Sequence, residues 1–475
     1  MNVLHQLFAR HFGTQAVRME SVQGALGGSG RIIVRLSNEQ HSAVGVLHGV
    51  REENAAFLEF SRHFRRHGLP VPEIYAEDLN AGAYLEEDLG NLTLFQFLSE
   101  HHSGTEIAPE VIAAYRKVVE TLPRFQIEAA SDLNYKVCYP RASFDRQSIA
   151  WDLNYFKYYF LRLAGVDFHE QALEEDFRRL TRFLLTAEHD YFLYRDFQSR
   201  NIMLRAGDPW FLDYQGGRRG ALQYDIASLL FDAKADLPPE LRAELLAHYM
   251  ESVQRYVPVK RETFLQYYYG YVYVRLMQAL GAYGFRGFYE RKPLFLQSVP
   301  YALRNLRWLL HNVTLPIELP ALMAAFTSMI GSEKLQAISE GDRELTVQVS
   351  SFSFHGGPLA DESGNGGGYV FDARCLPNPG REERFKALSG RDQEVIDYLM
   401  REESVHQYLA SALQLVEQSI GSYRRRGFQH LMISFGCTGG QHRSVFLAEQ
   451  LAKRLSGREG LRVVVRHHEQ EKWPR

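Results

Sequence analysis

The chain has 475 residues, a formal net charge of −3 and a sequence pI of about 6.7. This near balance excludes the global basic field that points to nucleic acid or an anionic membrane. Its three cysteines are widely spaced and too few for a disulfide framework or a zinc site. We find neither a signal-peptide pattern nor an apolar run long enough to cross a bilayer, so we expect a cytoplasmic protein without a membrane partner.

The first notable segment is a glycine-rich turn followed by two apolar runs, at 32–36 and 43–47, which predict strands. Glycines let backbone N–H groups approach phosphate closely, so such a turn can cover ATP. An ordinary hairpin turn is the alternative. The residues of this turn that we assign to ATP binding are Gly27, Gly28, Ser29, Gly30 and Arg31.

A helix is predicted over residues 52–67, because its apolar residues fall on one face. The run 83–90 indicates a strand that leads into a hinge, so Glu86 and Asp88 are also assigned to ATP. Residues 106–190 and 236–330 are expected to be mostly helical, and the aromatic group at 151–160 is expected to lie in the core rather than to form a ligand cage.

The segment Tyr194–Asn201, YRDFQSRN, is the most informative part of the chain, with Asp213 following twelve residues after its Asn. Asp, then Asn, then a second Asp is the order in which kinase-like folds present a catalytic carboxylate and two magnesium ligands. Asp196 would orient the acceptor hydroxyl, and Asn201 and Asp213 would supply the oxygen ligands that Mg²⁺ prefers. A chance D-x4-N spacing is the alternative, and the apolar runs on both sides argue against it.

Residues 331–344 are short of apolar side chains and indicate a linker, so we expect domains at 1–330 and 345–475. Near the end of the chain an apolar strand, a glycine loop and a helix start follow one another, which is an arrangement that binds anions. The anion site is assigned to Cys437, Thr438, Gly439, Gly440, His442, Arg443 and Ser444. The C-x5-R spacing within it is also that of Cys-dependent phosphatases.

The runs YRDFQSRNIML and FLDYQGGRRGALQYDIASLL resemble the aminoglycoside phosphotransferase superfamily, and within it the cell-wall amino-sugar kinases of the AmgK type. The resemblance covers residues 1–330 and implies ATP and Mg²⁺ as cofactors and the anomeric hydroxyl of N-acetylmuramate or N-acetylglucosamine as acceptor, in peptidoglycan recycling. It implies Asp196 as catalytic base and Asn201 and Asp213 as metal ligands. Asp152 is the residue assigned to the sugar, with a carboxylate on the helix surface as the alternative.

Residues 345–475 resemble the C-terminal domain of RapZ through GCTGGQHRS, the run 351–354 and VFDARCLPNP. That resemblance implies an amino-sugar phosphate such as glucosamine 6-phosphate as ligand, with RNA as a weaker partner. The expected fold is an α+β, protein-kinase-like, two-lobed domain followed by a smaller α/β domain. The sequence does not indicate an oligomeric state.

Two departures from the kinase pattern concern activity: Tyr194 stands where a His is usual, and no Lys occurs at 43–50, where better-known kinases place their phosphate-binding Lys. The alternatives that stay open are a kinase of another small alcohol or an aminoglycoside, a regulatory pseudokinase with an RNA- or metabolite-binding C-terminal domain, and phosphatase activity at Cys437.

Overall fold

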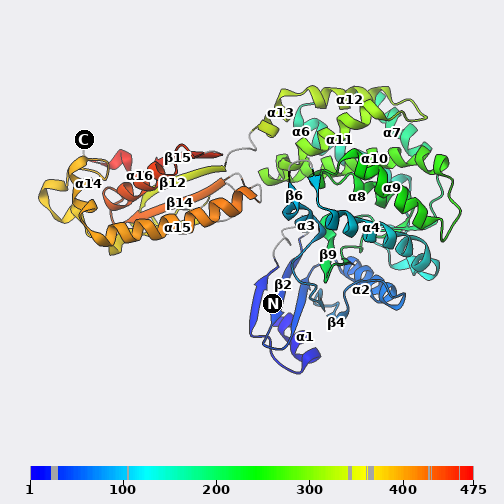
Figure 1. Ribbon diagram of the computed structural model, residues 1–475, viewed down its shortest axis with the longest axis horizontal. Coiled ribbons are helices and arrows are strands. Elements are labelled where there is room, and N and C mark those ends of the chain that lie inside the picture. The colour runs from blue at the N-terminus through cyan, green and yellow to red at the C-terminus, as the bar shows by residue number, and fades with distance from the viewer. Residues whose placement is uncertain are drawn as a thin grey trace. The chain divides into compact units, whose positions relative to one another are not determined.

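The computed structural model describes residues 2–22, 30–103, 106–340, 345–359, 361, 368–425, 428, 430–458 and 460–473. The chain divides into two compact units, here called the N-terminal unit, Met1–Glu290 with Ser298–Leu335, and the C-terminal unit, Arg291–Gln297 with Gln336–Arg475. An antiparallel sheet and a helical lobe make up the first unit, and a parallel sheet with helices makes up the second (Figure 1). The expected fold class is therefore confirmed.

The small lobe of the N-terminal unit is an antiparallel sheet with the strand order β1-β2-β3-β5-β4. Its strands are β1 Arg18–Ser21, β2 Ile32–Ser37, β3 Ser42–Leu47, β4 Ile74–Asp78 and β5 Ala83–Glu87. Leu85 of β5 packs into the core beneath α1 (Asn2–Phe12), whereas its neighbour Tyr84 stacks on Phe57 of α2 (Arg51–Arg66). Because successive side chains of a strand point to opposite faces, the two helices cover opposite faces of the sheet.

The large lobe is built around α10 (Arg261–Gly284), which is buried along most of its length. A Cβ on Gly281 would lie 2.9 Å from the backbone of Phe156, and one on Gly284 would lie 2.0 Å from the backbone oxygen of Tyr159. These two glycines therefore permit the close packing of α10 against α5 and against the π-helical turn Lys157–Leu161 that follows it. The other helices of the unit are α3 Leu94–Glu100, α4 Pro109–Pro123, α5 Arg146–Phe156, α6 Arg162–Ala164, α7 Glu170–Leu184, α8 Gln223–Leu230, α9 Pro239–Val253, α11 Val299–Asn312 and α12 Pro320–Gly331.

Two short pairs of strands in the large lobe position the loops that carry the predicted phosphoryl-transfer residues. Strand β8 (Tyr191–Leu193) pairs with β11 (Arg218–Gly220), and β9 (Ile202–Arg205) pairs with β10 (Asp208–Phe211), both in antiparallel fashion. The loop between β8 and β9 holds Asp196, and the loop between β10 and β11 holds Asp213. A third small pair consists of β6 His102–Ser103 and β7 Glu106–Ile107.

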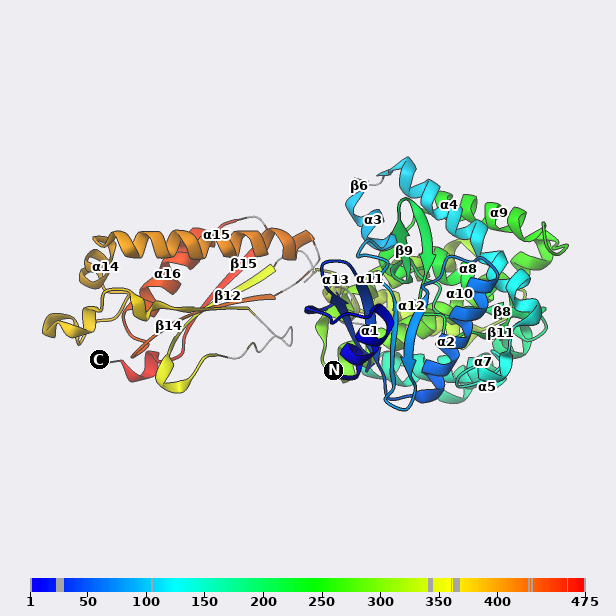
Figure 2. The same ribbon diagram turned by 90° about the horizontal axis from the view of Figure 1, so that it is seen from below.

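The sheet of the C-terminal unit is parallel and has the strand order β13-β14-β12-β15. Val347 and Val349 of β12 enter the core, whereas Thr346 and Gln348, which alternate with them along the strand, are partly exposed. One face of the sheet is therefore covered more fully. Helices α15 and α16 contribute to that core, and Figure 2 shows α15 lying along the strands. The elements are β12 Leu345–Ser353, β13 Gly368–Asp372, α14 Gln393–Met400, α15 Glu403–Arg425, β14 His430–Cys437, α16 Arg443–Leu455 and β15 Leu461–His467.

Within the expected linker at 331–344 lies a helix, α13 (Glu333–Glu340), and residues 341–344 lie outside the described part. One expectation from the sequence needs correction. The aromatic group at 151–160 is only partly core: Phe156 and Phe160 are buried, whereas Trp151 and Tyr158 are 45% and 50% exposed. Among the described residues, no helix combines the length and apolar character needed to cross a membrane.

Candidate functional site

The three predicted phosphoryl-transfer residues lie together. Asn201 Nδ2 donates to the backbone oxygen of Asp196 at 2.8 Å and to Oδ2 of Asp213 at 3.0 Å. Gln215 Nε2 donates to Oδ1 of Asp213 at 2.6 Å. The side chain of Asp196 is partly exposed and faces Gly216, where a Cβ would lie 3.7 Å from its Oδ2. A glycine there keeps space open in front of the carboxylate.

The loop between β8 and β9, which holds Asp196, is here called the catalytic loop. Tyr194, which stands where a His is usual, braces this loop through its hydroxyl. The ring is fully buried, and its OH donates to the backbone oxygen of Leu212 at 2.6 Å. Burial raises the pKa of Tyr194 well above its ordinary value, so the hydroxyl keeps its proton. This bond ties the segment before Asp196 to the segment before Asp213.

The carboxylate of Asp225 accepts hydrogen bonds from the backbone of the same loop. Its Oδ2 accepts from the N–H of Tyr194 at 2.8 Å and from Gln126 Nε2 at 3.0 Å, and its Oδ1 accepts from the N–H of Arg195 at 3.0 Å. From the sequence we assigned no role to Asp225, although it lies in the run 224–230 that belongs to the family resemblance. Its function depends on a contact between residues 30 apart in sequence, which spacing alone does not reveal.

Asp152 is the buried counterion of Arg195 and does not lie on the helix surface, so that alternative is wrong. Its two oxygens accept from Arg195 Nη1 at 2.7 Å and Nη2 at 2.6 Å, and Tyr224 OH lies 2.6 Å from Nη1. Arg195 has a φ of 85°, a left-handed conformation that disfavours residues with a Cβ. The bidentate ion pair therefore offsets local backbone strain next to Asp196.

Arg218 is a second buried guanidinium close to the catalytic loop, and it is 6% exposed. Its Nε donates to the backbone oxygen of Gly216 at 2.9 Å and its Nη2 to that of Tyr139 at 3.4 Å. Among the described residues no carboxylate pairs with it. Burial, and secondly the charge of Arg195, lower the pKa of Arg218 to about 10. A buried cation without a carboxylate is unusual and favours a bound anion.

Arg31 occupies the place left by the missing Lys. Its Nη1 lies 3.2 Å from Oδ1 of Asp213, and its Nη2 lies 2.5 Å from Oε1 of Glu53, in the first turn of α2. The other oxygen of Glu53 is 2.9 Å from Nε2 of His48. Protein kinases use an ion pair between a β3 Lys and a helix Glu at this location. Here the cation comes from the residue that precedes β2.

The other residues assigned to ATP differ in their surroundings. Asp88 is committed to local contacts, accepting from Arg35, from Ser42 Oγ at 2.5 Å and from the N–H of Gly90. Glu86 is buried, its Oε2 lacks a hydrogen-bond partner, and burial raises its pKa to about 8. The turn residues Gly27, Gly28 and Ser29 lie outside the described part of the chain, whereas Gly30 lies within it.

The donor set around Asp213 fits a divalent cation. Burial and the nearby charge of Asp196 raise the pKa of Asp213, and a bound cation would relieve the repulsion between the two carboxylates. The amide of Asn201 donates through Nδ2 to both neighbours, so its Oδ1 remains as an oxygen ligand. Carboxylate and amide oxygens are the ligands that Mg²⁺ prefers.

In the C-terminal unit, the predicted anion loop follows β14 at the carboxyl end of the parallel sheet, where such sheets usually bind ligands. Thr438 and Gly439 are exposed. The bulky cations are used elsewhere: Arg443 Nη1 donates to the backbone oxygens of Arg374 and Leu376, each at 3.0 Å, and His442 Nε2 contacts that of Phe385 at 2.8 Å. Arg443 Nη2 also donates to Thr438 Oγ1 of the loop at 3.3 Å, and the buried Nε of Arg443 has no hydrogen-bond partner.

Cys437 lies beneath this loop and is buried. Its Sγ accepts from the N–H of Gly440 at 3.2 Å and lies 3.1 Å from Ser444 Oγ. A phosphatase nucleophile must reach the phosphorus of its substrate, and a phosphatase Arg must point into the loop. Nη2 of Arg443 does contact the loop, at 3.3 Å from Thr438 Oγ1, so it is the burial of Cys437 that disfavours the phosphatase alternative.

Comparison with known proteins matches residues 25–258 to the phosphotransferase enzyme family and residues 345–471 to the RapZ C-terminal domain. A nucleotide-binding protein of Ruegeria sp. is 44% identical over 127 residues, which is 27% of this chain and 40% of that protein. One from Azoarcus sp. is 40% identical over 167 residues, 35% of this chain and 52% of that protein. The chain thus spans about half the length of the curated relatives it matches, or less.

Solved structures similar to the chain include the choline kinase LicA of Streptococcus pneumoniae, with 13% identity, a TM-score of 0.43, and 64% of this chain and 98% of that one covered. Spectinomycin phosphotransferase APH(9)-Ia, in complex with ADP and spectinomycin, has 10% identity, a TM-score of 0.44, and 69% and 98% covered. The family matches show that the protein joins two known domains. The first is a domain of the phosphotransferase enzyme family, and the second is a RapZ C-terminal domain.

Proposed function

We propose that the protein is an ATP- and Mg²⁺-dependent kinase that phosphorylates the anomeric hydroxyl of an amino sugar of the N-acetylmuramate or N-acetylglucosamine type, in cell-wall recycling. The observation that carries the kinase proposal is the single hydrogen-bonded group formed by Asp196, Asn201 and Asp213. The amino sugar rests on the sequence resemblance of residues 1–330.

In the proposed reaction the acceptor hydroxyl oxygen attacks the γ-phosphorus of ATP, the bond from that phosphorus to the β,γ-bridging oxygen breaks, and ADP leaves. Asp196 orients the hydroxyl and takes its proton. Asn201 and Asp213 would hold Mg²⁺, which neutralises phosphate charge when bound. Arg31 would bind phosphate oxygens while Glu53 keeps its guanidinium in place.

The charges near Asp196 favour an anionic acceptor within this class. Asp152 neutralises Arg195, but Arg218 donates only to backbone carbonyls. A carboxylate on the acceptor would supply the missing counterion, whereas a polycationic aminoglycoside would add positive charge beside two guanidinium groups. We therefore favour N-acetylmuramate, which carries a carboxylate, over the neutral N-acetylglucosamine.

For the C-terminal unit we propose binding of an amino-sugar phosphate such as glucosamine 6-phosphate. The supporting feature is the exposed glycine loop between β14 and α16, whose backbone N–H groups lie at a helix start. If this ligand changes kinase activity, thermodynamic linkage requires kinase ligands to change its affinity as well.

ADP production with N-acetylmuramate and with N-acetylglucosamine tests the kinase proposal, using wild type and Asp196→Asn. We expect sugar-dependent ADP release by wild type, reduced by about 10³-fold or more in the variant. Equal rates in the two proteins, or none with either sugar, would reject the amino-sugar kinase.

A further inference from the structure

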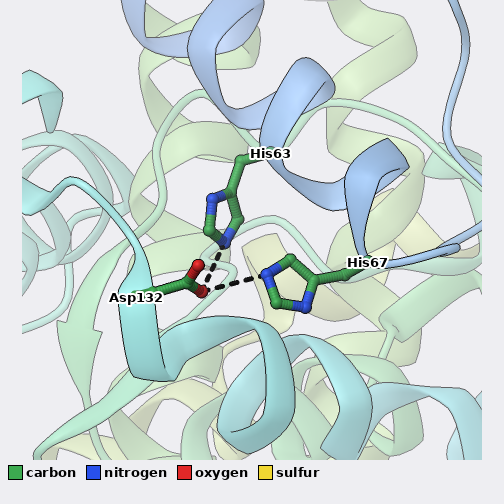
Figure 3. Close-up of side chains that lie close together, drawn as sticks. All are labelled: His63, His67 and Asp132. Carbon is green, nitrogen blue, oxygen red and sulfur yellow. Dashed lines mark hydrogen bonds and ion pairs between the residues drawn. The ribbon is translucent and has the colours of Figure 1, made fainter.

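A cluster of metal-binding side chains lies away from the site described above. His63 and His67 are one helical turn apart near the end of α2, and Asp132 is the last residue of the short 3-10 helix Ala129–Asp132 in the large lobe. Figure 3 shows both imidazole rings pointing at the same carboxylate. Nε2 of His67 is 2.9 Å and Nε2 of His63 is 3.5 Å from Oδ1 of Asp132.

These separations fit a tetrahedral metal site. The three ligand atoms all lie within 4.8 Å of one another. With metal–ligand bonds near 2.0–2.1 Å, ligand atoms of a tetrahedral zinc site are about 3.4 Å apart. Two His residues at i and i+4 of one helix face are a recurring zinc-binding arrangement. Only small rotations of the rings are therefore needed to admit an ion.

The surroundings supply an entry path for an ion. The side chain of Asp132 is 67% exposed and that of His67 is 25% exposed, so an ion and a water ligand can reach the group. His63 is buried and closes the inner side of the cluster. Nitrogen ligands select Zn²⁺ and similar ions over Mg²⁺.

Metal binding would break two existing contacts of His63. Nε2 of His63 lies 2.7 Å from the backbone oxygen of Ala129, and that hydrogen bond would be lost. Arg66 Nη2, 3.4 Å from Nδ1 of His63, would turn away when Nδ1 takes up the proton. Each loss weakens metal binding, so we expect micromolar rather than nanomolar affinity.

We propose that His63, His67 and Asp132 form a Zn²⁺ site that joins the end of α2 to the large lobe. The first turn of the same helix carries Glu53, the partner of Arg31. An ion at this site would therefore fix the helix that positions Arg31. The site does not depend on the identity of the sugar acceptor.

Isothermal titration of the full chain with Zn²⁺ in the presence of excess Mg²⁺ tests this site, and Co²⁺ provides a spectroscopic probe. We expect one micromolar site and the visible absorption of tetrahedral Co²⁺. His67→Ala and Asp132→Asn should each weaken binding by about tenfold or more and remove the Co²⁺ band. His189→Ala, a histidine outside the cluster, should change neither.

Thermal unfolding by circular dichroism would establish that the variants are folded. Zn²⁺ should raise the melting temperature of wild type and of His189→Ala, and leave that of His67→Ala and Asp132→Asn unchanged. Equal affinity and equal Co²⁺ spectra in all four proteins would overturn the proposal, and the cluster would then be a helix-end ion pair only. Failure of this test would leave the kinase proposal unaffected, because its readout is metal binding.

Discussion

Nη1 of Arg31 lies 3.2 Å from Oδ1 of Asp213, although 182 residues separate them in the sequence. The pair joins the start of β2 in the small lobe to the expected metal-binding loop of the large lobe. Under the proposed function, Arg31, the residue that precedes β2, would take the part of the missing β3 Lys. If a divalent cation neutralised Asp213, Arg31 would be free to contact phosphate while Glu53 held its guanidinium.

Loss of the Arg31 guanidinium should reduce kinase activity strongly. We expect Arg31→Met to lower kcat/KM for ATP by about 100-fold, because a charge-assisted contact to phosphate is lost in a site shielded from water. Arg31→Lys should retain part of the activity. Steady-state ADP release measures both, and Arg62→Met, at a more exposed arginine, is the control. A normal rate for Arg31→Met would show that Arg31 serves only structure.

Arg218 should determine the preference between the two sugars. We expect Arg218→Gln to lower kcat/KM for N-acetylmuramate by about tenfold or more, since one charged contact is removed, and to change that for N-acetylglucosamine by less than about twofold. The ratio of the two specificity constants, measured for wild type and variant, isolates the carboxylate contribution. Equal losses for the two sugars would assign Arg218 to the loop rather than to the acceptor.

Asp225 should contribute to stability as well as to the geometry of the catalytic loop. In Asp225→Asn, an amide group faces three N–H donors where the carboxylate accepted all of them. We expect a loss of about 2–3 kcal/mol in the free energy of unfolding, measured with urea. Asp190→Asn is the matched control, because Asp190 is 88% exposed. A variant as stable as the control would mean that the loop does not depend on these bonds.

Part of this site follows from the sequence and part does not. Asp196, Asn201 and Asp213 are recognisable because their spacing is set by one loop and one hairpin, and both are local. The pairing of Asp152 with Arg195 and the contact of Asp225 with the loop join segments far apart in the chain. The left-handed backbone at Arg195 follows from those contacts, so no local pattern predicts it. The strands predicted at 32–36 and 43–47 and the helix predicted at 52–67 agree with β2, β3 and α2 to within about a residue, because apolar periodicity is a local signal. Most helices of the large lobe were expected only as helical regions.

The pKa of Glu86 should make stability depend on pH. Burial raises this pKa from 4.5 to about 8, and the groups around it are Arg31 and Asp213. The unfolded state loses its proton near pH 4.5 and the folded state near pH 8, so the stabilisation is full below pH 4.5 and is lost as pH rises toward 8. We expect a slope of roughly 1 kcal/mol per pH unit from this group.

Urea unfolding between pH 5 and 8.5 measures this slope. In Glu86→Gln the contribution of this group should disappear, so the variant should gain stability relative to wild type as the pH rises. A constant difference between the two proteins over that range would show that Glu86 does not titrate there.

The glycine loop of the C-terminal unit offers a matched pair of substitutions. Gly440 has a φ of 69°, and a Cβ there would lie 2.6 Å from Cγ of Glu469, whereas a Cβ on Gly439 would meet nothing within 4 Å. We expect glucosamine 6-phosphate to raise the melting temperature of wild type and Gly439→Ala. Gly440→Ala should lose this shift, because the loop must move. A shift retained in Gly440→Ala would place the ligand elsewhere.

The hydroxyl brace at Tyr194 has a consequence for the environments in which the enzyme can work. A His at this position would change its charge between pH 5 and 8. The contact that braces the catalytic loop would then depend on pH in that range. The buried phenol does not ionise there, and its bond to Leu212 persists. Acidification would therefore leave the bond between Tyr194 and Leu212 intact, so we expect residue 194 to contribute nothing to the pH dependence of the proposed kinase.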